Sequence, residues 1–448
     1  MSVHPIEYRY FTEEMKKIWT EESKLQAWLD VETALAKVNA KLGIIPQKAA
    51  EEIKKKANLK FVKLERVKEI EEDIHHDLMA MVKALSEACE GDAGKYVHVG
   101  ATSYDIEDTA YALLFRDSIK IIENKLKELK KVLINLAEKH KKTICVGRTL
   151  GQHADPTTYG MKFAVYATEV QRHLDRLEEV KKRILVGKMT GAVGTQASFG
   201  SKGKEIQNLV MKELGLKPVL VSTQVIQRDR YAEVIHDLAL IAATLEKIAK
   251  EIRNLQRTEI AEVFEPFVAK QVGSSTMPHK MNPHKSERIC GLARIVRAFV
   301  HPALENISLE HERDLTNSSS ERIIFPETFI LTDYMIKEMI GILSGLEFNY
   351  DNIKKNLELT KGLIMTENVM LGLVKKGMGR QEAHELLRQA SMRIVKENKT
   401  LKEVLLKNEI IKKNFTEKEL DWYLDPKNYL GTAVEQVENV IKTLRVKK

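Results

Sequence analysis

Residues 273–287 read GSSTMPHKMNPHKSE and concentrate side chains that can transfer protons or hold anions. The segment has three serines, two histidines and two lysines, and only its two methionines add apolar bulk. Polar residues of these types are rarely buried in a core. Hydroxyl, imidazole and ammonium groups are those that enzymes use for proton transfer and for stabilising negative charge. The segment therefore predicts a functional loop.

Five further polar segments interrupt or flank apolar stretches of the chain. They are EEDIHHDLMAM (71–81), HVGATSYDIEDTA (98–110), GRTLGQHADPTTYG (147–160), STQVIQRDR (222–230) and HERDLTNSSSER (311–322). Taken singly, Thr102, Ser103, Asp105 or Thr158 could be an ordinary helix N-cap, and Pro156 a helix breaker. Capping, however, needs one side chain per helix and not whole clusters. Because helix N-termini also attract anions, the joint pattern favours an anion-binding site built from helix ends.

The elements that must position these segments are long helices. Between Gly100 and Gly147 there is no Gly or Pro, and apolar residues recur at alternating spacings of four and three. They are Phe115, Ile119, Ile122, Leu126, Leu129, Leu133 and Leu136. A second segment without Gly or Pro, 219–265, repeats the pattern at Ile241, Leu245, Ile248, Ile252 and Leu255. Helices this long predict an elongated bundle that buries its surplus apolar surface by oligomerisation.

Further helices are expected over about 158–185 and after Lys285, and in the C-terminal region over 357–376 and 380–396. No sustained strand alternation is present. The sequence thus predicts an all-α protein with a central bundle of long helices. We expect three domains: an N-terminal helical domain (1–100), the bundle with the loop (101–350) and a C-terminal helical domain (351–448).

Composition narrows the function classes. The net charge is +8 in 448 residues, but the lysines are interleaved with glutamates along helices, which is typical of solvated helix faces and disfavours a nucleic-acid binder. The N-terminus lacks the apolar core of a signal peptide, and no apolar run approaches the roughly 20 residues of a membrane helix. The three cysteines form no pair motif. We expect a cytoplasmic protein without membrane contact, disulfides or a structural metal.

GSSTMPHKMNP resembles the GSSxMPxKxNP signature of the fumarase/aspartase superfamily, and segments 98–110 and 147–160 resemble its two other shared regions. Further stretches are similar to the adenylosuccinate lyases within that superfamily. They are YRYFTEEMKKIWTEESKLQAWLDVE near the N-terminus, HHD at 75–77, GKMTGAVGTQASF at 187–199, STQVIQRDR and HERDLTNSSSERI. The similarity extends from about Tyr8 to about Leu430.

This resemblance implies a β-elimination that releases fumarate from adenylosuccinate, giving AMP, and from succinyl-aminoimidazole carboxamide ribotide in purine biosynthesis. It implies Ser274 as the base, Lys280 and Asn282 as holders of the substrate carboxylate, and Glu287 as an orienting residue. The loop would close over substrate as a lid. A serine hydroxyl is a weak base, so backbone N–H groups and Lys280 are expected to stabilise its ionised form.

The resemblance also implies a set of substrate contacts and a homotetramer whose active sites are shared among three subunits. The implied contacts are Arg9, Tyr10, His75, His76, Asp77, Thr102, Ser103, Gln224, Lys280, Asn282, Arg313, Ser318 and Arg322. Arginine suits the phosphate and carboxylates of an anionic nucleotide because its planar group binds them in a bidentate manner. The resemblance implies no metal ion and no organic cofactor.

Three positions depart from the family pattern. The family has an arginine at the positions of His75 and Met281, and its general-acid histidine falls at Leu150. Leucine cannot donate a proton, so turnover should be impaired unless His76 protonates the leaving nitrogen through a water molecule. The alternatives are a homologue disabled in catalysis, a variant made to trap substrate, and a sister lyase of the argininosuccinate lyase type.

Overall fold

The computed structural model describes residues 3–267, 270 and 272–446. The chain divides into two compact units, and several long helices run from one unit into the other. The first unit comprises Met1–Lys127, His173–Leu245 and Gly291–Lys337. The second unit comprises Glu128–Arg172, Glu246–Cys290 and Glu338–Lys448. The division into three domains that the sequence suggests stays a prediction.

The first unit begins with helices of 4 to 21 residues, several of which have a side-chain N-cap. Thr12 accepts a hydrogen bond from the amide of Met15, and Thr20 accepts one from the amide of Ser23. These helices are α1 (Pro5–Tyr8), α2 (Glu13–Ile18), α3 (Glu21–Lys41), α4 (Gln47–Lys56), α5 (Leu64–Ile74) and α6 (Asp77–Ala88). A 3-10 turn, η1 (Ala93–Tyr96), leads to the first long helix.

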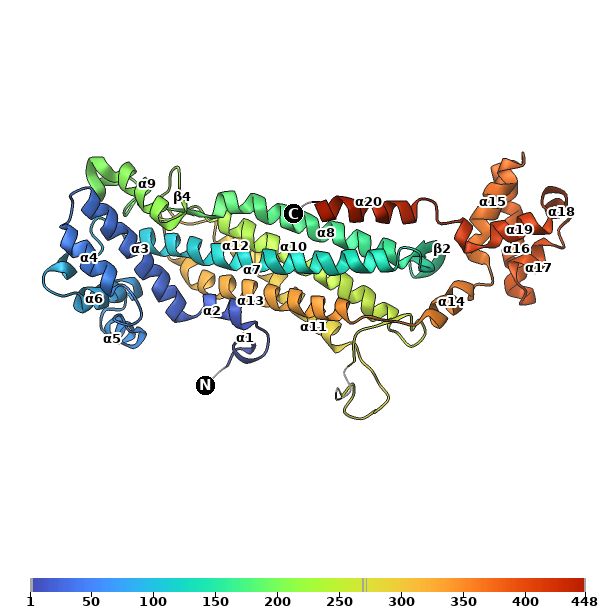
Figure 1. Cartoon of the computed structure of the whole chain (residues 1–448), viewed down its shortest axis with the longest axis horizontal. Helices are drawn as coiled ribbons and strands as arrows, with labels where there is room; N and C mark the ends of the chain where they lie inside the picture. Colours follow the sequence, from blue (N-terminus) through green and yellow to red (C-terminus); the bar gives the residue numbers. More distant parts are fainter. Residues whose placement is uncertain (1–2, 268–269, 271, 447–448) are drawn as a thin grey trace. The chain divides into compact units, whose positions relative to one another are not determined.

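The long helices confirm the prediction of an all-α protein. They are α7 (Ser103–Lys139), α8 (Tyr159–Ile184), α10 (Asp229–Leu255), α11 (His284–Ala298) and α13 (Thr316–Ser344). Shorter elements between them are η2 (Ala197–Lys202), α9 (Gly203–Leu214) and α12 (Val300–Glu305). Within each unit, segments of α7, α8 and α10 run alongside one another (Figure 1).

The predicted apolar stripes face the interior of the bundle. On α7 the residues from Phe115 to Leu133 in the stripe are fully buried, and Leu136 is half-buried. On α10 every stripe residue from Ile241 to Leu255 is buried. In the first unit, Phe115 also packs edge-to-face on Phe325 and Trp19 stacks on Phe329. Burial of these stripes explains why long helices form from segments rich in Lys and Glu.

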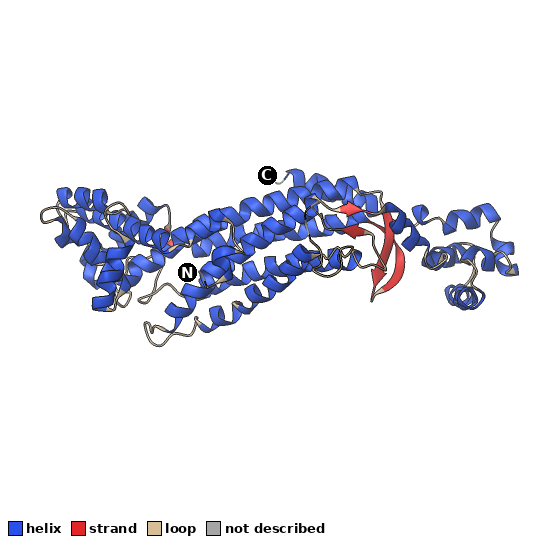
Figure 2. Cartoon of the chain, turned by 90° about the horizontal axis from the view of Figure 1, so that it is seen from below, coloured by secondary structure: helices blue, strands red, loops and turns tan. Residues whose placement is uncertain are grey.

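In the described part of the chain, three small two-stranded sheets accompany the helices (Figure 2). The longest is an antiparallel hairpin of β1 (Ile144–Thr149) and β2 (Gln152–Thr158) in the second unit. No strand is predicted there from the sequence, because the polar, Gly- and Pro-containing segment lacks a period of two. The other sheets are β3 (Val186–Gly187) with β4 (Lys217–Pro218), and β5 (Val263–Phe264) with β6 (Glu347–Phe348).

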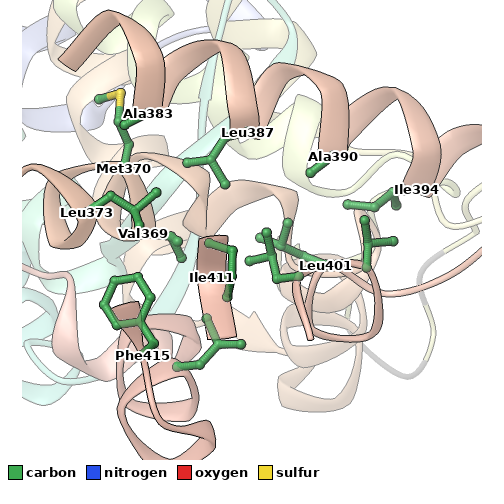
Figure 3. Close-up of a cluster of buried hydrophobic side chains, with 13 residues drawn as sticks. Val369, Met370, Leu373, Ala383, Leu387, Ala390, Ile394, Leu401, Ile411 and Phe415 are labelled. Carbon is green, nitrogen blue, oxygen red and sulfur yellow. The ribbon is translucent and has the colours of Figure 1, made fainter. Parts of the chain in front are cut away.

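Five C-terminal helices pack around an apolar cluster that includes Leu373, Leu387, Leu401 and Phe415 (Figure 3). They are α15 (Thr366–Lys375), α16 (Arg380–Glu397), α17 (Leu401–Leu405), α18 (Glu409–Asn414) and α19 (Glu417–Leu424). Two other helices of this region, α14 (Tyr350–Glu358) and α20 (Ala433–Val446), contact the β1–β2 hairpin instead. Two 3-10 turns, η3 (Leu363–Met365) and η4 (Pro426–Asn428), join them.

One helix prediction in this region is wrong. A single helix was expected over 357–376, but the chain turns between α14 and α15. Gly362 has a φ of 91°, in the left-handed region that glycine tolerates best, and it ends the helical path. Among the described residues, no helix is long and apolar enough to cross a membrane.

Candidate active site

A cavity of about 470 Å³ lies in the first unit. Its walls come from the end of α5, the starts of α6, α7 and α13, and the segment that precedes α13. The lining residues are Glu71, His75, His76, Asp77, Ser103, Tyr104, Glu107, Arg313, Leu315, Ser318, Ser319 and Arg322. The cavity thus brings together residues from three of the polar segments that the sequence singled out. We call it the binding cavity.

Helical spacing places two pairs of polar side chains on the binding cavity. Ser103 and Glu107 lie four residues apart on α7, and Ser318 and Arg322 lie four residues apart on α13. Residues at this spacing share one face of a helix. The first turns of α7 and α13 therefore both present hydrogen-bonding groups to the same space.

Arg322 is held by a carboxylate at the wall of the cavity. Its Nη2 donates a hydrogen bond to Asp77 Oδ2. Burial alone would raise the pKa of Asp77, but the charge and hydrogen bond of Arg322, together with Lys24 and the Leu78 amide, outweigh it and lower that pKa. Asp77 is the first residue of α6, where a carboxylate also interacts favourably with the helix dipole. The Arg322 guanidinium is thus fixed and permanently charged.

His75 and His76 form the turn between α5 and α6. His75 ends α5 with a φ of 54°, and His76 is the N-cap of α6. The Nδ1 atom of His76 accepts a 3.4 Å hydrogen bond from the amide of Met79, and its Nε2 lies 3.4 Å from Ser103 Oγ. Because Nδ1 acts as an acceptor, Nε2 is the nitrogen that carries a proton in the neutral ring. This nitrogen can donate to Ser103 or to a ligand.

Arg313 and Gln224 meet although 89 residues separate them in the sequence. Arg313 Nη1 donates a 2.7 Å hydrogen bond to Gln224 Oε1, and Gln224 Nε2 donates at 2.9 Å to the carbonyl of Ala192. The Arg313 guanidinium also lies 3.5 Å from the centroid of the Tyr104 ring. Gln224 is not among the residues that line the cavity, but it orients one that is.

The other predicted contacts of the first unit lie outside the lining of this cavity. Thr102 precedes α7, and its amide donates to Asp105 Oδ2 at 2.9 Å. Arg9 ends α1, and Tyr10 packs against Tyr334 at 5.7 Å. A role for Thr102, Arg9 and Tyr10 in substrate binding stays a prediction.

Two buried ion clusters fix the start of α7. Asp105 and Lys188 form a fully buried pair, and Arg228 bridges Asp108 and Glu321 in a second one. Burial raises the pKa of Glu321 to about 7. Removing one member of a buried pair typically destabilises a protein by about 3–5 kcal/mol. These clusters therefore stabilise the position of α7, whose start forms part of the cavity wall, although none of their members lines the cavity.

Residues 273–287, which we call the signature loop, lie in the second unit. Ser274 Oγ accepts hydrogen bonds from the amides of Thr276 at 3.3 Å and Met277 at 3.1 Å. Asn282 Nδ2 and His284 Nε2 lie 2.8 and 3.0 Å from the carbonyl oxygen of Gly273. Two N–H groups aimed at one hydroxyl oxygen favour negative charge on that oxygen, which is what a serine base requires.

The end of the loop joins α11 through a buried carboxylate. Glu265 accepts hydrogen bonds from the amides of Lys285 at 3.1 Å and Ser286 at 3.0 Å, and thereby caps α11. Glu287, which the sequence suggested as an orienting residue, is exposed and lies 3.7 Å from Arg253. Lys280 is exposed and borders a cavity of about 910 Å³ between the loop and the end of α10.

Leu150 occupies the tip of the β1–β2 hairpin. Thr149 pairs with Gln152, so Leu150 and Gly151 form a two-residue turn, with φ values of 53° and 78°. Such values are typical of the type I′ turns that join hairpin strands. The Leu150 side chain is completely exposed. It contributes nothing to the core, and a leucine with positive φ is unfavourable.

His153 lies opposite Arg148 in the hairpin and not at its tip. Its Nδ1 atom is buried and has no hydrogen-bond partner among the described residues. Burial and the Arg148 charge lower the pKa of His153, so the ring is neutral near pH 7. Near His153, the carboxylate of Glu262 accepts hydrogen bonds from the side chains of Arg148, Tyr159 and Asn356. His153 is therefore half-buried in the hairpin face, away from position 150.

Sequence reasoning missed Glu71, Tyr104 and Glu107 in the lining of the binding cavity. The signal for Glu107 was its spacing of four from Ser103. Burial, and then the Asp77 charge, raise the pKa of Glu107 to about 8. Among the described residues, no group of three or more His, Cys, Asp and Glu side chains is arranged to hold a metal ion.

Comparison with known proteins gives these features a family. Residues 7–298 match the family model described as lyase, and residues 362–440 match the model for the adenylosuccinate lyase C-terminus. Adenylosuccinate lyase of Pyrococcus abyssi is 62% identical over 441 residues, which is 98% of this chain and 98% of that protein. The chain belongs to the adenylosuccinate lyase family. It is therefore a C–N lyase of the fumarase/aspartase superfamily.

Two further comparisons extend this result. Adenylosuccinate lyase of Pyrococcus horikoshii is 60% identical to this member of the family, with 99% of this chain and 98% of that protein covered. The crystal structure of a fumarate lyase from Mesorhizobium sp. BNC1 has a TM-score of 0.90 and 35% identity, with 97% and 98% coverage. The adenylosuccinate lyase family assignment therefore applies to the whole chain.

Proposed function

We propose that this chain cleaves adenylosuccinate to AMP and fumarate, and succinyl-aminoimidazole carboxamide ribotide in the same way. The observation that carries the proposal is the binding cavity, in which two arginines and several hydroxyls surround a space suited to an anionic nucleotide. The similarity over the full chain to proteins named adenylosuccinate lyase supports the same substrate class.

The proposed binding residues divide by chemistry. Arg313 and Arg322 provide permanent positive charge for phosphate or carboxylate oxygens. Ser103, Ser318 and the His76 Nε2 proton provide neutral hydrogen bonds. The remaining proposed contacts are Arg9, Tyr10, His75, Asp77, Thr102 and Gln224.

The proposed reaction is a β-elimination. Ser274, ionised, removes the proton from the carbon next to a carboxylate, and the electrons of that C–H bond form the new C=C bond. The C–N bond breaks, and its electron pair goes to the departing nitrogen, which takes up a proton. Lys280 and Asn282 stabilise the carboxylate that becomes an aci-form in the transition state. Glu287 is proposed to orient neighbouring groups.

This chain differs from the family pattern in the residue available to protonate the departing nitrogen. Position 150 is that of the general acid, and Leu150 has no proton to give. His76 is the proposed substitute, because its Nε2 can carry a proton and the ring borders the binding cavity. A general acid contributes typically 10²–10⁴-fold, so turnover should be slow by a factor of about that size.

We further propose a homotetramer in which segments of three subunits complete each site, in the cytoplasm and without a metal or organic cofactor. The chain supplies a binding cavity in one unit and a catalytic loop in the other. Light scattering at micromolar concentration should give the mass of four chains. A monodisperse monomer would contradict this part of the proposal.

The test of the activity combines two measurements. Turnover is measured as the change in absorbance when the protein is added to adenylosuccinate. The affinity of the protein for adenylosuccinate is measured by calorimetry. Binding with slow turnover supports the proposal. A second candidate, a nucleotide-binding homologue without activity, is favoured by Leu150 and predicts binding with no turnover. If adenylosuccinate does not bind at all, the proposed substrate is wrong.

A further inference from the structure

Tyr104 has a place in the binding cavity that neither the family pattern nor the proposed reaction uses. It is the second residue of α7 and only 3% exposed, yet it belongs to the lining of the cavity. A buried tyrosine of this kind commonly packs its ring and pairs its hydroxyl. Here the ring contacts a predicted substrate contact, Arg313.

The ring of Tyr104 supports the guanidinium of Arg313. The guanidinium carbon lies 3.5 Å from the ring centroid, within contact distance for a stacked cation. Arg313 lies in the segment before α13, outside any helix or strand. A long side chain on such a segment samples many rotamers unless its neighbours restrain it. The ring restrains Arg313 by covering one face of the planar group.

Hydrogen bonds fix the orientation of Arg313 within that plane. Nη1 donates to Gln224 Oε1 at 2.7 Å, and Gln224 is held in turn by the carbonyl of Ala192. The Nε atom of Arg313 is buried and has no hydrogen-bond partner among the described residues. Because the Nε edge is closed to solvent, the bond to Gln224 and the Tyr104 ring together decide how the guanidinium is presented to the cavity.

The hydroxyl end of Tyr104 lies towards Ser318, which belongs to the first turn of α13 and lines the same cavity. Burial and the Glu107 carboxyl raise the pKa of Tyr104, so the phenol stays protonated at neutral pH. The neutral ring therefore connects the start of α7 to an arginine of the same cavity.

We infer that Tyr104 is a positioning residue for the anionic ligand: it holds the Arg313 guanidinium flat at the wall of the binding cavity. This inference rests on the proposed function, in which Arg313 contacts the nucleotide. Tyr104 acts through Arg313 and not on the reacting atoms. Its removal should therefore weaken binding and raise KM more than it lowers kcat.

The experiment measures AMP affinity by calorimetry and KM and kcat with adenylosuccinate. Tyr104→Phe keeps the ring and should bind AMP within about threefold of the unchanged chain. Tyr104→Leu loses the ring face, and a cation–π contact of this kind corresponds to roughly 3- to 30-fold in affinity. Tyr166→Leu is the matched control. Tyr166 lies on α8, and its ring also contacts a cation, Lys247 on α10, but it is outside the lining of the binding cavity.

Arg313→Ala and the double variant Tyr104→Leu/Arg313→Ala decide between positioning and simple packing. If Tyr104 acts through Arg313, the double variant binds AMP no more than about twofold worse than Arg313→Ala alone. If the two losses multiply, Tyr104 acts independently of Arg313 and the inference is overturned. Arg313→Lys, which needs no change at Tyr104, keeps the charge without the planar group and should weaken AMP binding at least about threefold.

The outcomes separate this inference from the proposed function. Weak binding in Arg313→Ala with unchanged binding in Tyr104→Leu overturns the role of Tyr104 and leaves the nucleotide site intact. Unchanged binding in both means that AMP does not use this cavity, and then the proposed function fails as well. AMP affinity in Arg313→Lys equal to that of the unchanged chain would also overturn the inference, since stacking would then be unnecessary.

Discussion

In the binding cavity of the first unit, the key charged side chains already have partners, whereas residues 275–281 of the signature loop are all exposed. Arg322 is paired with Asp77, and Arg313 is hydrogen-bonded to Gln224 and stacked on Tyr104. The hydrogen bonds around Ser274 are local to the loop, and come from residues two and three positions on.

This difference indicates a division of labour between binding and chemistry. The groups that we propose to recognise the substrate are held by their neighbours without a ligand, which would reduce the entropy lost on binding. Groups that react need to exclude water only when substrate is present, which suits a loop that closes late. Variants in the binding cavity should therefore change affinity, and variants in the loop should change turnover.

The largest effect is expected for Ser274→Ala. Loss of the base should lower turnover by a factor of about 10²–10⁴ or more, while AMP affinity stays within about tenfold. Steady-state rates and calorimetry are to be compared, with Ser275→Ala as the matched loop control. Turnover equal to that of the unchanged chain would mean that Ser274 is not the base and that the loop does not carry the chemistry.

The second effect concerns the tip of the hairpin. Leu150→His restores a proton donor at a fully exposed position, and should raise turnover by at least about tenfold. Histidine also tolerates positive φ better than leucine. Leu150→Asn is the control, because asparagine suits the turn but is no general acid. If the histidine variant gains no more than the asparagine variant, another residue supplies the proton.

A third variant acts on the binding side alone. Arg322→Ala removes a charge-assisted hydrogen bond of roughly 1.5–3 kcal/mol, so AMP should bind about 10- to 100-fold more weakly. Arg66→Ala serves as the control, since Arg66 pairs with Glu87 and Glu69 on the exposed face of α5. Equal AMP affinity in Arg322→Ala and Arg66→Ala would locate the anion site elsewhere.

The last effect concerns neither turnover nor affinity but the pH dependence of stability. The pKa of Glu107 is raised by burial to about 8, from an ordinary value of 4.5. The folded state keeps this proton where the unfolded state has lost it. Its contribution to stability is therefore fully present below about pH 4.5 and is lost as the pH rises towards 8, by up to about 1.4 kcal/mol per pH unit.

Glu107→Gln removes that ionisation without removing the side chain. Denaturant unfolding at pH 5, 6.5 and 8 should show a variant whose stability, relative to the unchanged chain, increases with pH. Parallel curves for the two proteins would mean that Glu107 does not keep its proton in the folded cavity. The electrostatics of the cavity would then have to be described with Glu107 ionised.

The helices and the polar segments could be predicted from the sequence, but their meeting points could not. Heptad spacing identified the buried stripe from Phe115 to Leu133 because burial depends on local periodicity. The hairpin around Leu150 gave no strand signal, since its pairing follows from turn geometry. The Arg228–Asp108 and Arg313–Gln224 contacts join residues distant in sequence, and no local pattern encodes them.

The central claim is that the binding cavity is built before the ligand arrives and the catalytic loop gains order afterwards. Hydrogen exchange of the ligand-free protein and of its complex with adenylosuccinate tests this directly, and the slow turnover that we predict from Leu150 would preserve the complex during the measurement. We expect the amides of 319–322 on α13 to exchange slowly in both states. Those of 275–281 should exchange fast without ligand and more slowly with it. A loop as protected as α13 without ligand, or as fast with saturating adenylosuccinate as without, would contradict the account.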